Sequence, residues 1–140
     1  MKKQVTVIGG GPAGMAAALF AARAGAKVVL LERNEKLGKK LYITGKGRCN
    51  VPKTAENRME SIPHNPRFLH SAFAFFDAGD LRALLDANGC PTKEERGGRV
   101  FPVSDKASDV TRALTRALSN AGVEVRLNQR ADALNDLLAL

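Results

Sequence analysis

The chain has 140 residues, which is long enough for one domain with a buried core. Its formal net charge of +8 raises the question of nucleic acid. Residues 33–53 carry seven basic side chains and one acidic one, but Tyr42 is their only aromatic residue. Because bases would find little to stack on there, the sequence predicts no nucleic-acid partner. Cys49 and Cys90 provide neither a disulfide framework nor a zinc-binding spacing, which favours the cytoplasm.

The N-terminal part of the chain contains an uncharged run, 5–22, preceded by Lys2 and Lys3. That pattern is compatible with a signal peptide or a short membrane span. However, four glycines and a proline within residues 9–14 break the run where a continuous helix is needed. The sequence therefore predicts no membrane segment.

The first elements along the chain indicate a βαβ unit. A short buried strand is expected at 5–8, a helix from about 12 to 24 with Gly25 as its stop, and a second buried strand at 28–31. A strand, a glycine turn, a helix and a strand within about thirty residues form a parallel, right-handed crossover.

The middle of the chain predicts loop and helix. Residues 33–65 are polar and rich in Gly, Asn and Pro, so they are expected to be mostly loop. Amphipathic helices are expected at about 67–77 and 80–88, with Gly89 ending the second. The first should bury Phe68, Leu69, Ala72, Phe73 and Phe76, and the second Leu81, Leu84 and Leu85.

The last part of the chain predicts a hairpin at 92–101 that turns at Gly97-Gly98. A helix capped by Ser104 or Asp105 should then run to about Asn120. A third strand at 123–127 could join the parallel sheet. The predicted fold class is α/β: a Rossmann-like parallel sheet of about three strands with added helices and a small hairpin.

The strongest motif follows the first strand. Gly9-Gly10-Gly11-Pro12-Ala13-Gly14 satisfies the pattern G-x-G-x-x-G. Gly9 permits a tight turn, Gly11 lets a pyrophosphate approach the backbone, and Gly14 lets helix and strand pack closely. The helix that starts at Pro12 and Ala13 then points its first amides at the anion, and proline suits that position because it lacks an N–H.

Glu32 supports a nucleotide site, because it closes the second strand 18 residues after Gly14. Its carboxylate is expected to accept hydrogen bonds from ribose hydroxyls. A 2′-phosphate about 4 Å away would be repelled by roughly 4 kcal/mol at an effective dielectric near 20, although Arg33 could offset part of this. The motif leaves both NAD and FAD open.

The basic stretch after Glu32 is either a solvated loop or a loop that meets the diphosphate of a cofactor. Gly45 and Gly47 can adopt left-handed angles and present consecutive amides as an anion nest. Lys46 and Arg48 would add positive charge to that nest.

Three further stretches resemble a known family. These are Leu-Gly-Lys-Lys at 37–40, Thr-Gly-Lys-Gly-Arg-Cys-Asn at 44–50, and Gly-Arg-Val-Phe-Pro-Val-Ser-Asp-Lys-Ala at 98–107. Together with the glycine motif they are similar to bacterial FAD flavoproteins of the NAD(P)/FAD-dependent oxidoreductase family, which has aminoacetone-oxidase-like and bile-acid-reductase-like members. The resemblance covers most of residues 4–128.

The resemblance implies that FAD is the cofactor, that hydride passes between flavin and a small-molecule substrate, and that NAD(P)H is a possible electron donor. Gly9, Gly11, Gly14 and Glu32 would hold the ADP half, and residues 38–50 would lie along the diphosphate and flavin. The expected cofactor-binding residues are Gly9, Gly11, Pro12, Ala13, Gly14, Glu32, Arg33, Gly38, Lys39, Lys40, Gly45, Gly47, Arg48, Cys49 and Asn50.

Two departures from the family pattern shape the domain prediction. Pro52-Lys53-Thr54 stands where members have Thr-Asn, and members are much longer than this chain. Residues 1–130 are therefore expected to be the N-terminal part of an FAD-binding domain, with 131–140 as a divergent, helical tail. Such a chain would be inactive alone and could self-associate through an exposed apolar sheet edge. The alternatives are an NAD-binding domain without flavin and a non-catalytic nucleotide-binding fragment.

No catalytic or metal-binding residue is predicted. Cys49 has neither a resolving thiol nor a nearby histidine in sequence, so a structural thiol is favoured over a redox one. Cys90 is also expected to be structural, and His64 and His70 are weak acid–base candidates.

Overall fold

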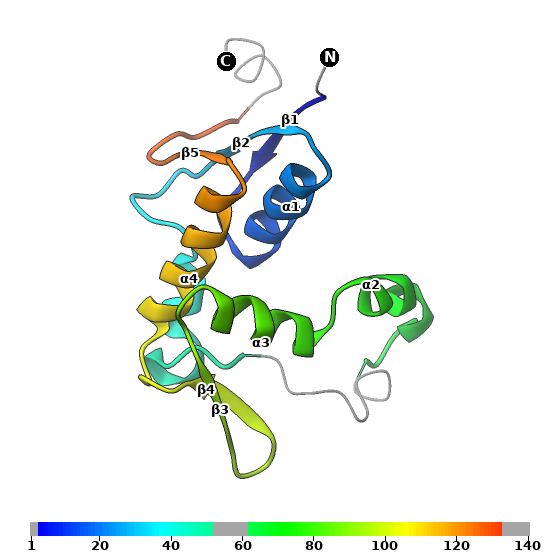
Figure 1. The fold of residues 1–140 in the computed structure, drawn as a ribbon, viewed down its shortest axis with the longest axis vertical. Coiled ribbons are helices and arrows are strands. Elements are labelled where there is room, and N and C mark those ends of the chain that lie inside the picture. The colour runs from blue at the N-terminus through cyan, green and yellow to red at the C-terminus, as the bar shows by residue number, and fades with distance from the viewer. Residues whose placement is uncertain (1–2, 52–61, 133–140) are drawn as a thin grey trace.

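The computed structural model describes residues 3–51 and 62–132, and its centre is a parallel sheet. The strands β1 (Gln4–Ile8), β2 (Lys27–Leu31) and β5 (Glu124–Arg126) lie in the order β1-β2-β5 (Figure 1). Val7 pairs with Leu30, and Leu30 pairs with Val125. The predicted three-stranded, Rossmann-like sheet is confirmed.

Two helices cover the same face of this sheet. They are α1 (Pro12–Arg23), which links β1 to β2, and α4 (Ala107–Asn120), which precedes β5. Met15 of α1 and Leu118 of α4 share one core cluster with Leu30 of β2. Right-handed crossovers that progress in one direction along a sheet place their helices together in this way.

Residues 5–8 form a strand, as predicted, but the prediction that this strand is buried is wrong. Val5 and Val7 pack partly against the core, whereas Thr6 is exposed and Ile8 is 55% exposed. The reason is that β1 lies at the edge of the sheet and the described helices cover one face of it. Strand residues alternate between faces, so every second side chain of β1 stays in solvent.

A second cluster lies below the sheet, around the predicted hairpin. The hairpin consists of β3 (Thr92–Glu95) and β4 (Arg99–Pro102), which pair antiparallel as expected. It packs near α3 (Ala78–Ala87), whose Leu85 joins Cys90 and Val100 in a buried cluster. Helix α3 begins earlier than predicted because Asp77 and Asp80 form a reciprocal capping box.

The loop predicted at 33–65 contains a 3₁₀ helix, η1 (Lys39–Gly47), whose backbone leaves helical angles at residues 44–46. The helix predicted to start at Ser104 or Asp105 instead has Lys106 as its N-cap. No side chain caps it, so α4 relies on the packing of its apolar face.

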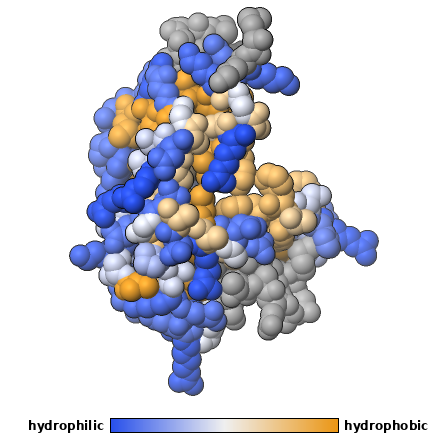
Figure 2. Space-filling view, viewed as in Figure 1, coloured by the Kyte–Doolittle hydropathy of each residue, from blue (hydrophilic) through white to orange (hydrophobic). Residues whose placement is uncertain are grey.

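The helix predicted at 67–77 is split into η2 (Pro66–Leu69) and α2 (His70–Phe75), and neither contains a buried residue. Phe68 is 80% exposed and Ala72 is also exposed, contrary to expectation. Figure 1 shows α2 standing apart from the sheet, and Figure 2 shows apolar residues gathered around it. Amphipathic spacing predicted the helix, and Phe20 of α1 contacts Phe75 and Phe76 edge to face, but these contacts leave the segment without a buried residue.

Within residues 3–51 and 62–132, no helix is long and apolar enough to cross a membrane. The predicted helical tail and the Pro52-Lys53-Thr54 departure fall largely outside the described residues.

Candidate functional site

The glycine turn, residues 9–14, joins β1 to α1 through a conformation that requires glycine. Gly9 has a φ of +100° and donates its N–H to the Leu31 carbonyl at 2.8 Å, which ties the turn to β2. A Cβ on Gly14 would lie 1.8 Å from the Gly9 carbonyl oxygen. The turn and the first turn of α1 are therefore packed backbone against backbone.

Gly11 differs from its neighbours because a Cβ there would meet nothing within 4 Å. It is the N-cap of α1, with Pro12 at the first helical position. The first-turn amides of Ala13 and Gly14 have no intrahelical acceptor and lie at the positive end of the helix dipole. Open space beside bare backbone at a helix N-terminus suits an anion such as a diphosphate.

Glu32 lies at the end of β2 with its side chain turned toward the glycine turn. Oε2 accepts from the Gly10 amide at 2.6 Å, and Oε1 accepts from the Asn34 amide at 2.8 Å and from Asn34 Nδ2 at 2.6 Å. Burial on its own raises the pKa of Glu32, but the hydrogen bonds from Asn34 and Gly10 outweigh it and the pKa lies below its usual value. The carboxylate is thus held ionised at the carboxyl end of the central strand β2.

Gly10 is a functional position that the motif pattern leaves unspecified. A Cβ on Gly10 would lie 2.3 Å from Leu37 Cδ2 and 3.0 Å from Glu32 Oε2. Its carbonyl accepts from the Gly38 amide at 2.7 Å. Gly10 is therefore needed so that Glu32 and the 37–38 segment can close against the turn.

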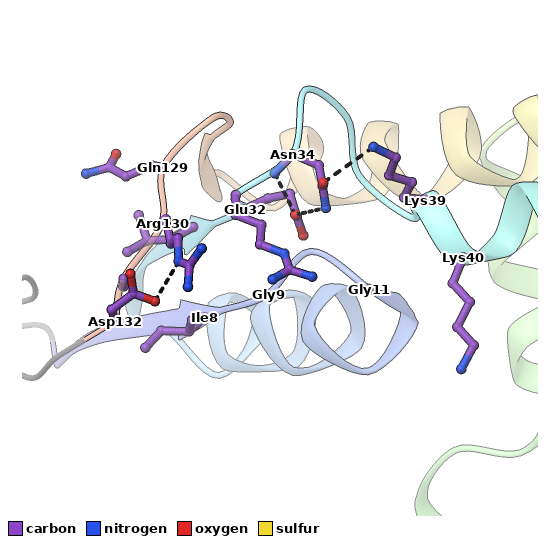
Figure 3. A pocket seen from close by; sticks show the side chains of 13 residues that line it. Ile8, Gly9, Gly11, Glu32, Asn34, Lys39, Lys40, Gln129, Arg130 and Asp132 are labelled. Atoms are coloured by element: carbon purple, nitrogen blue, oxygen red, sulfur yellow. Dashed lines mark hydrogen bonds and ion pairs between the residues drawn. The ribbon is translucent and has the colours of Figure 1, made fainter.

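A cleft of about 650 Å³ opens between the glycine turn, the end of β2 and the segment after β5 (Figure 3). It brings together six of the predicted site residues: Gly9, Gly11, Glu32, Arg33, Lys39 and Lys40. Gly14 and Gly38 pack behind the turn, and neither they nor Ala13 line the cleft.

The cleft also has a wall that was not predicted from the sequence, formed by Asn34 and residues 129–132. The Asn128 amide donates to the Asn34 carbonyl at 3.0 Å, and the Gln129 amide donates to the Glu32 carbonyl at 2.9 Å. The carboxyl ends of parallel strands meet at one edge, so the predicted third strand was the available signal for this wall.

Positive charge surrounds the cleft. Lys39 Nζ lies 3.3 Å from Glu35 Oε2 and 3.4 Å from Asn34 Oδ1, and it is exposed. In Figure 3, Lys40 extends from the start of η1 on the side of Gly11. Arg130 pairs with Asp132 at 2.6 Å. A cleft lined by cations, a helix N-terminus and the Glu32 carboxylate, with its second carboxylate, Asp132, paired to Arg130, can hold a diphosphate and a hydroxylated sugar together.

An apolar cavity of about 310 Å³ lies on the other side of the start of α1. It is lined by Pro12 and by Cys49 and Asn50, together with apolar residues of α1, α3 and α4. Gly11 and Pro12 are consecutive, so the polar cleft and the apolar cavity adjoin at the first turn of α1.

The 44–51 loop, which follows the first part of η1, holds the other predicted residues. Gly45 and Gly47 have φ values of +56° and +84°, and Cys49 is left-handed at +60° without being glycine. A Cβ on Gly45 would lie 2.9 Å from the Asn50 amide and 3.1 Å from Phe101. The left-handed angles expected of an anion nest are present, but these angles also let the loop pack tightly against β4.

The Arg48 side chain does not add a free positive charge to the expected anion nest. Its guanidinium is paired with the carboxylates of Glu95 and Asp105, and Arg48 does not line the cleft. The Arg48 and Cys49 amides donate back within the loop, to Gly45 at 3.2 Å and Thr44 at 3.1 Å. Two amides of the predicted nest therefore form hydrogen bonds within the loop and do not point at an anion.

Comparisons with known proteins agree with this geometry. Residues 3–137 match the HI0933-like protein Rossmann domain. The chain belongs to this family. It is a family of FAD-binding oxidoreductases, as the sequence resemblance implied.

Relatives of this HI0933-like domain are longer proteins. The 3-dehydro-bile acid delta(4,6)-reductase of Clostridium scindens is 35% identical over 94% of this chain and 32% of its own length. The ribosomal RNA dihydrouridine synthase of Escherichia coli is 31% identical over 86% of this chain and 30% of its own length. The crystal structure of Thermovibrio ammonificans THI4 superposes with a TM-score of 0.59 at 20% identity, covering 90% of this chain and 38% of that one, which supports the fold.

The two cysteines of this HI0933-like domain are buried and not joined. Burial raises the pKa of the Cys49 thiol, against a smaller lowering by a hydrogen bond with Thr44, and burial likewise raises the pKa of Cys90. These properties favour the structural interpretation. His64 and His70 are exposed, and no metal-binding cluster of His, Cys, Asp or Glu occurs in the described ranges.

Proposed function

We propose that this chain binds FAD, with the ADP half in the cleft beside the glycine turn. The observation that carries the proposal is the open space at Gly11, which faces a cleft closed by an ionised Glu32. The diphosphate lies against Gly11 and the first amides of α1, and the ribose hydroxyls approach the Glu32 carboxylate. Arg33, Lys39 and Lys40 balance the phosphate charge.

The flavin end of FAD is proposed to extend past Pro12 toward Cys49 and Asn50. The support is that these three residues line the apolar cavity that adjoins the cleft. A nicotinamide dinucleotide without flavin would use the cleft equally well, but the adjoining apolar surface and the family favour FAD. A 2′-phosphate beside Glu32 is disfavoured by charge.

FAD supplies hydride transfer when bound. We propose that the whole protein uses it to pass hydride between NAD(P)H and a small-molecule substrate, in the cytoplasm and without a nucleic-acid partner.

The chain spans about a third of the length of its curated relatives, and we propose that substrate contacts lie outside its 140 residues. Residues 1–130 are proposed to be part of the FAD-binding domain and 131–140 its divergent tail. Exposed Ile8 at the β1 edge supports weak self-association.

Competition calorimetry tests the cofactor assignment. FAD is expected to bind more tightly than NAD or NADP, and a ribosomal RNA fragment is expected not to displace it. Gly11→Val should abolish FAD binding with little change in the melting temperature, because its side chain enters the cleft and not the core. The matched variant Gly11→Ala should bind more weakly than wild type but retain binding. Tighter binding of a nicotinamide cofactor, or unchanged FAD affinity in Gly11→Val, would contradict the proposal.

A further inference from the structure

Two of the motif stretches that carry the family resemblance meet at one side chain. Arg48, from 44–50, lies with its guanidinium carbon 3.8 Å from the centre of the Phe101 ring, which belongs to 98–107. A guanidinium this close to an aromatic face is held by both stacking and charge. The 44–51 loop and β4 are therefore linked by a contact that connects residues far apart in sequence.

The edge of the same guanidinium is occupied by two carboxylates. Nε donates to Asp105 Oδ1 at 2.9 Å, Nη2 donates to the same oxygen at 2.7 Å, and Nη1 and Nη2 both donate to the Glu95 carboxylate. Lys93 Nζ holds the other Asp105 oxygen at 2.8 Å. These bonds use four of the five N–H donors of the arginine, and only one remains for a phosphate.

The carboxylates come from both sides of the hairpin. Glu95 ends β3, and Asp105 follows β4 with a left-handed φ of +58°. Such angles in a residue other than glycine are uncommon and are retained where surrounding contacts fix them. Asp105, Arg48 and the left-handed Cys49 thus meet where the loop and the hairpin meet.

Two further contacts join the loop and β4 on either side of Arg48. The Val51 amide donates to the Val100 carbonyl at 2.9 Å, and Gly45 packs so closely against Phe101 that a Cβ would lie 3.1 Å from its ring. Cys49 and Asn50 lie between these contacts and line the apolar cavity. Any shift of the loop would move this wall of the cavity.

We infer that Arg48 is a positioning residue that locks the 44–51 loop onto the β3–β4 hairpin and thereby sets the wall that the flavin end of FAD meets. Arg48 does not act as a ligand of the diphosphate. The expected effect on FAD binding rests on the proposed function. The attachment of the 44–51 loop to the hairpin through Arg48 does not, because it is present in the ligand-free chain.

The decisive variants are Arg48→Gln and the double variant Glu95→Gln/Asp105→Asn. If Arg48 positions the loop, both should weaken FAD binding by about fivefold to tenfold and leave ADP binding within about twofold, since ADP lacks the flavin end. The absorbance and fluorescence of the bound flavin should change in both variants. The control Arg99→Gln removes a charge from the same hairpin, where Arg99 is exposed and donates to the Arg96 carbonyl, and it should change none of these.

The double variant distinguishes a positioning role of Arg48 from a phosphate-binding role, because the two roles change FAD affinity in opposite directions. A phosphate-binding Arg48 released from its carboxylates would bind both FAD and ADP more tightly, because both carry the diphosphate, and that result would overturn the inference. Equal losses of FAD and ADP in Arg48→Gln would also overturn it.

Hydrogen exchange of the ligand-free chain tests the lock independently of any cofactor. Amides of 44–51 should exchange faster in Arg48→Gln than in wild type, and those of the glycine turn should not. Unchanged exchange in the loop would overturn the inference even if FAD binds. If the wild-type chain binds neither FAD nor ADP while exchange in the loop rises, the proposed function fails and the lock stands.

Discussion

The glycine turn and the 44–51 loop both depart from regular structure through left-handed residues, but different forces hold them. The turn is fixed by short backbone bonds, such as Gly9 to Leu31 and Gly38 to Gly10, by the absence of side-chain atoms, and by one carboxylate, that of Glu32. The loop also has a backbone bond, from Val51 to Val100, but it depends in addition on the side chain of Arg48 and on carboxylates from another part of the fold. The turn should therefore fail when an atom is added, and the loop when a charge is removed.

The largest expected effect is that of Gly14→Ala. Alanine normally stabilises an exposed helix position by up to about 1 kcal/mol relative to glycine. Here the added Cβ would lie 1.8 Å from the Gly9 carbonyl oxygen, which is backbone and cannot rotate away. We expect the free energy of unfolding to fall by about 3 kcal/mol, measured by urea denaturation.

The matched control is Gly11→Ala in the same turn. Its Cβ meets nothing within 4 Å, so the free energy of unfolding should stay within about 0.5 kcal/mol of wild type. Equal stability of the two variants would mean that the turn is not held by steric exclusion.

The next effect concerns the one charge on which the turn depends. In Glu32→Gln, an amide N–H₂ must face either the Gly10 amide or the Asn34 donors, so a donor meets a donor. We expect nucleotide binding to weaken by about 1.5–3 kcal/mol, the range for hydrogen bonds to a charged group, as measured by calorimetry. Glu35→Gln is the control, because Glu35 is exposed and pairs with Lys39 at the surface. Both variants make the same change in net charge, so an equal loss in both would mean that the hydrogen bonds of Glu32 are not its cause.

The two regions also differ in how far the sequence could predict them. The turn is local, so its glycine spacing and Glu32 were enough to predict a nucleotide cleft. The wall at Arg130 depends on where β5 joins the sheet, which the sequence left open. The partners of Arg48 are 47 and 57 residues farther along the chain, and charge alone suggested an anion instead. Phe68 lies in a helical segment, as predicted, but it is exposed and not buried. The periodicity of apolar residues predicts a helix but does not reveal what packs against its apolar face.

The smallest expected effect is an acid-induced loosening of the loop. Hydrogen bonds from Arg48 hold the pKa of Glu95 below its usual value, and Lys93 followed by Arg48 does the same for Asp105. Because both pKa values are lower in the folded chain, their contribution to stability is complete above about pH 4.5 and is lost as the pH falls through the folded values. Both carboxylates are partly exposed, so water and salt weaken their attraction to Arg48.

We therefore expect hydrogen exchange of 44–51, corrected for intrinsic rates, to rise only about twofold to fivefold between pH 5.5 and pH 3.5. The rise should shrink in 0.5 M salt, which screens exposed charges. It should be absent in Glu95→Gln/Asp105→Asn, where the loop is already loose at pH 5.5. The Gly9 amide, bonded to the Leu31 carbonyl, has no titrating partner and should keep its protection throughout. A parallel loss at Gly9 would mean that acid opens the whole sheet edge, and the two regions would then not be held by separate forces.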